Sequence, residues 1–97
     1  MSWVHVITPI VTTGFRAAAL PAPYGCRVTK SQIKQGPASI ESAVDEVLAA
    51  PGVVDSAIKA EEDGVQAVVI DCMLDPGLDA AREAVSIPVI GSGEAAM

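Results

Sequence analysis

The chain is poor in aromatic residues, in basic residues and in long apolar runs. Only 3% of its 97 residues are aromatic, although 51% are hydrophobic. A core must therefore be built from small aliphatic side chains, and a chain this apolar should fold rather than stay disordered. A chain of this length buries only about two-thirds of its unfolded surface, so we expect one small domain.

Two further absences bear on partners and location. Six basic residues stand against twelve acidic ones and form no block, which excludes an obvious nucleic-acid surface. No apolar run approaches the roughly 18 residues that span a bilayer, and the N-terminus lacks the pattern of a secretion signal. Without such a signal, Cys26 and Cys72 are expected to be free thiols. We therefore expect a cytoplasmic protein with no membrane or nucleic-acid partner.

Three short apolar segments are typical of strands, and a fourth, more polar segment at 24–33 can also hold one; each is bounded by proline, glycine or polar turn residues. They cover residues 3–7, 24–33, 65–70 and 87–90. The segment 65–70 has almost no polar alternation, so we expect it to be buried on both faces. Helical segments separate the strands, which predicts an α/β fold with a mostly parallel sheet and right-handed crossovers.

Helical periodicity is clearest after Ser39, which we expect to be an N-cap. The apolar positions predicted to face the core are Ile40, Val44, Val47 and Leu48. Pro51-Gly52 should interrupt this helix, and a second helix should then run to Gly64, a suitable C-terminal cap. Residues 15–20 can form only a stunted helix, because two prolines follow.

Another helix is expected after the third strand, with Asp75 as its N-cap and Pro76 as its first residue. A last helix should begin at Gly91-Ser92-Gly93. This segment also fits a G-x-G-x-x-A dinucleotide pattern, but it follows a late strand, which argues against that function. His5 is expected to be a strand-face residue, and no Cys/His cluster has the spacing of a metal site.

Cys72 is the main candidate for chemistry, because it lies where a strand ends and a helix begins. The positive end of that helix should favour its thiolate form. The backbone N–H groups that follow, of Met73, Leu74 and Asp75, are expected to hold an anionic oxygen of a substrate. The alternative is that Cys72 is a small buried apolar residue at a strand end.

Several stretches resemble the aspartate/glutamate/hydantoin racemase superfamily, and most of all its hydantoin racemase branch. They are GPASIES (36–42), PGVVDSAIKAEEDG (51–64), AVVIDCMLDPGLDAAREAVSIPVIG (67–91) and the closing EAAM. The Cys-x-x-Asp-Pro-Gly-Leu element is the most specific of them. The resemblance implies a flavodoxin-like parallel sheet with flanking helices. Residues 1–97 would be a single, truncated N-terminal lobe of a two-lobe fold.

The resemblance also implies an activity, the cofactor-independent racemisation of amino acids or their hydantoin derivatives. A pair of cysteines, one from each lobe, exchanges the α-proton, and Cys72 falls on the cysteine of the first lobe. Inversion needs one group on each face of the stereocentre, so the chain alone should be inactive or nearly so. Cys26 begins the second strand, near the opposite end of the sheet, and is expected to be structural.

Further substrate-binding positions follow from the same resemblance. The loop with Thr8, Pro9, Thr12 and Thr13 resembles the substrate-contacting segment, although it lacks the Asn-Pro-Asn pattern usual in hydantoin racemases. Gly36 and Pro37 would border the pocket, and so would Met73 and Leu74. The alternative is that the threonines cap local turns and that Gly36-Pro37 forms the turn before a helix.

Other functions remain compatible with these residues. Within the superfamily they are allantoin racemisation, maleate isomerisation and arylmalonate decarboxylation. Outside catalysis, the lobe would be a ligand-binding or self-associating module that forms a homo-oligomer through the exposed face between lobes. The partner expected under the racemase hypothesis is a small amino acid or hydantoin, with no cofactor.

Overall fold

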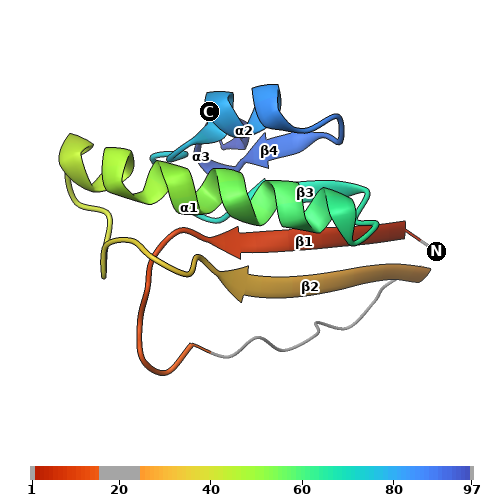
Figure 1. The fold of residues 1–97 in the computed structure, drawn as a ribbon, viewed down its shortest axis with the longest axis horizontal. Coiled ribbons are helices and arrows are strands. Elements are labelled where there is room, and N and C mark those ends of the chain that lie inside the picture. Colours follow the sequence, from red (N-terminus) through yellow and green to blue (C-terminus); the bar gives the residue numbers. More distant parts are fainter. Residues whose placement is uncertain (1, 16–24, 97) are drawn as a thin grey trace.

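The computed structural model describes residues 2–15 and 25–96, and these form a four-stranded parallel sheet with helices (Figure 1). The strands are β1 (Ser2–Thr8), β2 (Cys26–Gln32), β3 (Ala67–Ile70) and β4 (Val89–Gly91), and the helices are α1 (Ala43–Glu62), α2 (Leu78–Ala84) and α3 (Ser92–Ala95). The sheet order is β2-β1-β3-β4, the order of flavodoxin-like folds. The predicted parallel α/β fold is therefore confirmed.

The strand register brings the carboxyl ends of all four strands to one edge of the sheet. Thr8 pairs with Gln32, Ile7 pairs with Ile70, and Ile70 pairs with Gly91. We call this the carboxyl edge. Every loop that leaves it is brought close to its neighbours, although the loops are far apart in sequence.

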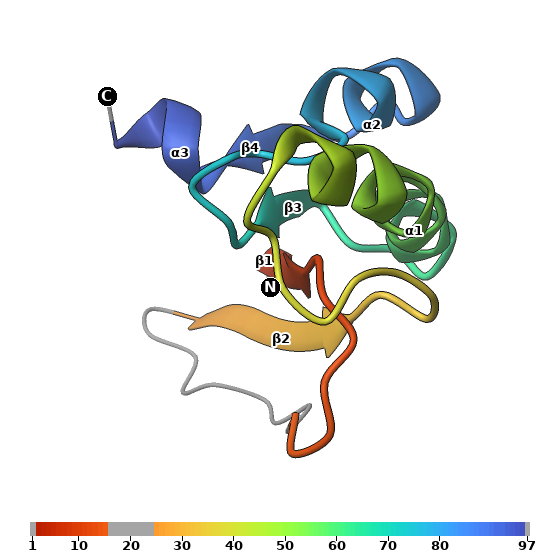
Figure 2. The same cartoon turned by 90° about the vertical axis from the view of Figure 1, so that its left-hand side faces the viewer.

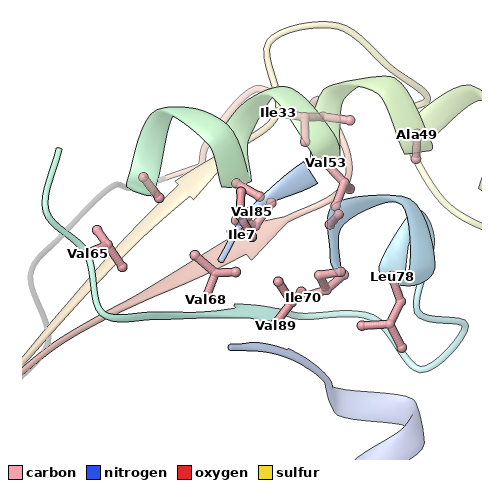
Figure 3. Close-up of a cluster of buried hydrophobic side chains, with 13 residues drawn as sticks. Ile7, Ile33, Ala49, Val53, Val65, Val68, Ile70, Leu78, Val85 and Val89 are labelled. Carbon is pink, nitrogen blue, oxygen red and sulfur yellow. The ribbon is translucent and has the colours of Figure 1, made fainter. Parts of the chain in front are cut away.

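The core lies between the sheet and the two longer helices, which pack on the same face of the sheet (Figure 2). Ile7, Val68 and Ile70 are completely buried there (Figure 3). The residues of α1 buried against them are small, namely Ala49, Val53, Ala57 and Ala60. Small side chains let this helix approach the sheet closely, and the core is filled by aliphatic groups, as the shortage of aromatic residues predicts.

β3 differs from the sequence-based expectation of burial on both faces. Val68 and Ile70 are buried, but Ala67 and Val69 on the opposite face are only half-buried. The strand is apolar on both faces, and only one of them is closed by α1 and α2.

The helix pair expected between residues 39 and 64 is a single helix. Its N-cap is Ser42, whose Oγ accepts the Asp45 N–H at 3.3 Å, and not Ser39. Pro51 lies inside the helix and is exposed, so the Val47 carbonyl that loses its usual partner can be hydrated. Gly64 has a φ of +96° directly after the C-cap, the left-handed conformation expected of a glycine that ends a helix.

Three of the four predicted core positions are wrong, whereas Ile40, which precedes α1, is half-buried and packs against the core as expected. Val44, Val47 and Leu48 are 66%, 71% and 56% exposed. The first turns of α1 extend beyond the carboxyl edge, so their apolar side chains have no sheet beneath them (Figure 1). The stunted helix expected at 15–20 falls almost wholly outside the described residues. Among the described helices, none has the length and apolarity needed to cross a membrane.

Candidate active site

The strand order reverses at β1: β2 lies on one side of β1 and β3 lies on the other. This position is the switch point of the sheet, and two loops flank it. We call residues 8–13 the β1 loop and residues 71–77 the Cys72 loop. The Asp71 N–H donates to the Ile7 carbonyl at 2.9 Å, which joins the start of the Cys72 loop to the end of β1. In open α/β sheets, ligands bind at this position.

Cys72 is a free, half-buried thiol directly beyond the end of β3. Its N–H donates to the Ile70 carbonyl at 3.1 Å and to the Ser92 Oγ at 3.0 Å. The sequence pattern predicted Ser92 to start a helix, within a weak dinucleotide pattern, and did not predict its contact with Cys72. The available signal was its position directly after a neighbouring parallel strand, which brings it to the same edge as Cys72.

Asp75 has a different role from the one predicted. α2 begins at Leu78, and its N-cap is Gly77, at φ +73°, which has no side chain with which to cap the helix. The Asp75 carboxylate instead accepts the N–H groups of Gly93 and Glu94 at 2.8 and 2.7 Å and so caps α3. Its own φ is +48°, a left-handed conformation that aspartate tolerates better than most residues.

The expected row of free N–H groups is only partly present. The Asp75 N–H donates to the Cys72 carbonyl at 3.0 Å, so it is not available to a substrate. Met73 and Leu74 are 66% and 48% exposed. Within residues 2–15 and 25–96, their N–H groups have no hydrogen-bond acceptor. Because α2 begins only at Leu78, Cys72 does not directly precede a helix N-terminus.

The β1 loop carries a buried hydroxyl that has no partner among the described residues, Thr8 Oγ1. The Thr12 N–H donates to the Gln32 side-chain oxygen at 3.0 Å, which ties the loop to the end of β2. Thr12 and Thr13 are exposed, whereas Pro9 is fully buried. Pro9 therefore shapes the loop from inside rather than offering a contact surface.

The loop with Gly36 and Pro37 lies beside the β1 loop, because the Val11 N–H donates to the Pro37 carbonyl at 2.9 Å. The structure thus gathers the sequence-predicted positions along one edge. Thr12, Thr13, Gly36 and Pro37 lie on its β2 side, whereas Cys72, Met73 and Leu74 lie on its β3 side, with Thr8 at the end of β1 between them.

Cys26 and His5 lie away from these loops. Cys26 pairs with Ser2 at the start of β2, at the opposite end of the sheet. His5 points toward α1 and contacts the hydroxyls of Thr29 and Ser31 at 2.6 and 2.7 Å. Burial lowers the pKa of His5, and the nearby Asp63 carboxylate opposes this effect.

The candidate site is an open edge rather than an enclosed cavity. Two cavities, of about 610 and 280 Å³, lie beside α1, and both are lined by Lys34, Ser56 and Lys59. Neither is lined by the β1 loop or the Cys72 loop. In the described part of the chain, no three His, Cys, Asp or Glu side chains are grouped to hold a metal ion.

The fold and the site together define the class of protein: a parallel α/β lobe with a free cysteine at the carboxyl edge of its sheet, beside the switch point. The sequence profile of the family described as Asp/Glu/Hydantoin racemase matches residues 8–97. The chain belongs to this family.

Three similar proteins agree with this assignment. The hydantoin racemase of Pseudomonas sp. (strain NS671) is 42% identical over 97% of this chain and 40% of its own length. The hydantoin racemase of Rhizobium meliloti is 39% identical over 97% and 41%. The allantoin racemase from Klebsiella pneumoniae superposes with a TM-score of 0.86 at 38% identity, over 99% of this chain and 41% of that one. The chain therefore spans about two-fifths of the length of these relatives.

Proposed function

We propose that this chain is the Cys72-bearing lobe of a cofactor-independent racemase that acts on hydantoins or the corresponding amino acids. The observation that carries the proposal is the position of Cys72, a free and half-buried thiol at the switch point of a parallel sheet. The relatives support the same class, because two of them are named hydantoin racemases and the superposed structure is named an allantoin racemase. Allantoin is itself a 5-substituted hydantoin, so this ring is the substrate class we favour.

Inversion requires that a proton leave one face of the stereocentre and that another arrive at the opposite face. In the proposed mechanism the Cys72 thiolate removes the proton from the ring carbon, and the electron pair of the broken C–H bond delocalises into the adjacent carbonyl. A second thiol, from a lobe outside residues 1–97, then donates its proton to the other face. Each thiol takes the other role when the opposite enantiomer reacts.

The β1 loop and the loop at Gly36-Pro37 would contact the polar groups of the ring. Thr8 supports this assignment, because its buried Oγ1 has no partner among the described residues. A buried hydroxyl without a partner costs about 1–3 kcal/mol, and a substrate amide or carbonyl would offset this cost. Thr12 and Thr13 follow Thr8 in the same loop and are exposed, and Met73 and Leu74 are exposed in the Cys72 loop at the same edge.

The exposed apolar side chains at the carboxyl edge are consistent with a covering lobe. They are Val44, Val47, Leu48, Met73 and Leu74. In the chain alone, this surface would face water, so we propose that the isolated lobe self-associates through it.

The test uses one enantiomer of 5-benzylhydantoin, and separately L-aspartate, in deuterated water. Proton NMR and optical rotation would follow α-deuteration and inversion. We expect the chain alone to show no more than the spontaneous background. A chimera in which residues 1–97 replace the matching segment of the Pseudomonas relative is expected to racemise the hydantoin.

Three outcomes would contradict the proposal. Rapid deuteration by the chain alone would refute the need for a second lobe. A folded chimera that keeps its activity after Cys72→Ser would refute the role of the thiol. Turnover of aspartate in preference to the hydantoin would refute the favoured substrate class.

A further inference from the structure

The segment after β4 packs directly against the Cys72 loop. We call residues 91–94 the β4–α3 corner. Three hydrogen bonds join the two segments: the Cys72 N–H donates to Ser92 Oγ at 3.0 Å, and the Gly93 and Glu94 N–H groups donate to the Asp75 carboxylate at 2.8 and 2.7 Å. One bond runs from the loop to the corner and two run back, so each segment restrains the other.

The two glycines of the corner allow this close approach. A Cβ at Gly91 would lie 2.5 Å from Asp75 Cγ. A Cβ at Gly93 would overlap the Met73 carbonyl oxygen and lie 2.7 Å from its carbon. Both positions exclude a side chain because the Cys72 loop occupies the space. This packing accounts for the Gly-Ser-Gly pattern, which by sequence alone resembles a weak dinucleotide-binding signal.

Arg82 of α2 braces the corner from its other side. Its guanidinium forms a two-pronged contact with the Glu94 carboxylate, at 2.8 and 3.2 Å, and its Nε donates to the Val89 carbonyl at 3.0 Å. The hydrogen bond between them raises the pKa of Arg82 and lowers the pKa of Glu94, so both side chains stay charged over a wide pH range. The corner is thus held between α2 and the Cys72 loop.

We propose that the β4–α3 corner positions the Cys72 thiol and that Ser92 is its positioning residue. Ser92 Oγ anchors the Cys72 N–H, and the Cys72 backbone sets the direction in which the thiol leaves the loop. The functional meaning of this arrangement rests on the proposed role of Cys72 in racemisation. The restraint itself is a property of the lobe and is measurable without turnover.

The experiment measures the alkylation rate of Cys72 by iodoacetamide in the purified chain, with Cys26→Ser in every variant so that one thiol remains. Ser92→Ala removes the acceptor of the Cys72 N–H. A hydrogen bond of about 1 kcal/mol net corresponds to about a five-fold change in local opening. We therefore expect Ser92→Ala to raise the alkylation rate about five-fold, and Ser92→Thr, which keeps the hydroxyl, to restore the wild-type rate.

Two controls separate positioning from a general loss of stability. Ser86→Ala removes an exposed hydroxyl from the turn before β4 and should leave the rate unchanged. Val28→Ala on β2 lowers global stability far from the corner, and it should also leave the rate unchanged. The proposal is wrong if Ser92→Ala reacts at the wild-type rate, if Val28→Ala accelerates alkylation as much, or if Ser92→Thr fails to rescue.

The chimera distinguishes this proposal from the proposed function. If Cys72→Ser leaves racemisation intact while Ser92→Ala still accelerates alkylation, the catalytic role fails and the positioning role stands. If Cys72→Ser abolishes racemisation and Ser92→Ala changes neither the alkylation rate nor kcat, the catalytic role of Cys72 stands and the positioning role of Ser92 fails.

Discussion

The two cysteines of this chain have the same chemistry and similar half-burial, but they lie at opposite ends of the sheet. Cys26 begins β2, and its Sγ donates to the carbonyl of the next residue, Arg27, at 3.9 Å. Cys72 follows β3, and its backbone is anchored by Ser92 at 3.0 Å. The carboxyl edge surrounds its cysteine with loops from neighbouring strands.

The difference shows that position in the topology, not residue type, marks the candidate catalyst. In a parallel sheet every strand ends at the same edge, so polar groups from distant segments converge there. The Cys72 loop meets β1 through Asp71 and α3 through Asp75. Four predictions test this contrast between the two ends.

The largest expected difference is between the chimera that lacks the Cys72 thiol and the chimera that lacks the Cys26 thiol. Cys72→Ser should lower kcat for hydantoin racemisation by about 10²–10⁴-fold, because a positioned acid/base group contributes that much. Cys26→Ser should leave kcat within about two-fold, because it is remote from the edge. Polarimetry on both variants measures kcat. Comparable losses of kcat in the two variants would show that the two ends of the sheet do not differ in their importance for catalysis.

The glycines at the two ends should also differ in their tolerance of a side chain. Gly93→Ala drives a methyl group into the Met73 carbonyl, so we expect a loss of about 3 kcal/mol, at the upper end for an overpacked site. Gly25 lies before β2 at φ +78°, and among residues 2–15 and 25–96 no atom lies within 4 Å of where its Cβ would be. Its change to alanine should lower the free energy of unfolding by about 1 kcal/mol, through backbone strain. Urea denaturation measures both, and equal losses would contradict the close packing at the corner.

His5, on the strand face beneath α1, should make stability depend on pH. Its pKa is lower in the folded chain than the ordinary 6.5, because burial disfavours the charged ring. The unfolded chain then binds a proton at His5 more tightly than the folded chain does. The free energy of unfolding is therefore highest above pH 6.5 and falls as the pH drops below it. Among the residues that the structure describes, the charged groups that line the same cavity as His5 are Asp63 and Lys59 of α1 and Lys34 after β2. Denaturation at pH 8 and pH 5.5 should show this loss, and His5→Gln should remove most of it.

A pH dependence unchanged in His5→Gln would assign the effect to other groups. Cys72→Ser serves as the matched control at the carboxyl edge, and we expect it to keep the pH dependence of the wild type.

The smallest effect on stability is expected at the overhanging turns of α1. Val47→Asp replaces a 71% exposed valine, so it should change the free energy of unfolding by no more than about 0.5 kcal/mol. It should nevertheless weaken self-association, which sedimentation velocity measures. Ala80→Asp adds the same charge to an exposed position of α2 and should have no such effect. A chain that is monomeric throughout, or two variants with equal effects, would refute an apolar contact at this edge.

Much of the fold was predictable because it follows from local patterns. The four strands lie within or close to their predicted segments, since apolar runs and their bounding turn residues are local signals. Cys72 was correctly placed after the third strand for the same reason. Its chemical role stays a prediction.

The interior of α1 was not predictable from periodicity. Pro51-Gly52 indicated a break, yet the helix continues, because Gly52 fits against Ile33 and Val53 is fully buried. A local signal for a helix end was overridden by tertiary packing. The larger apolar residues at 44, 47 and 48 indicated a core face, but the helix extends beyond the sheet there and its alanines form the contact instead.

The sequence by itself determined the four strands, the alternation of strands with helices that indicates a parallel sheet, and the position of the thiol after a strand. These features depend on residues that are neighbours in the chain. Only the tertiary structure decided that Ser92 holds the Cys72 N–H and that Asp75 caps α3 instead of α2. These contacts join residues 18 to 20 positions apart. They arise because β3 and β4 lie side by side and the glycines let their loops touch, and no local periodicity specifies that.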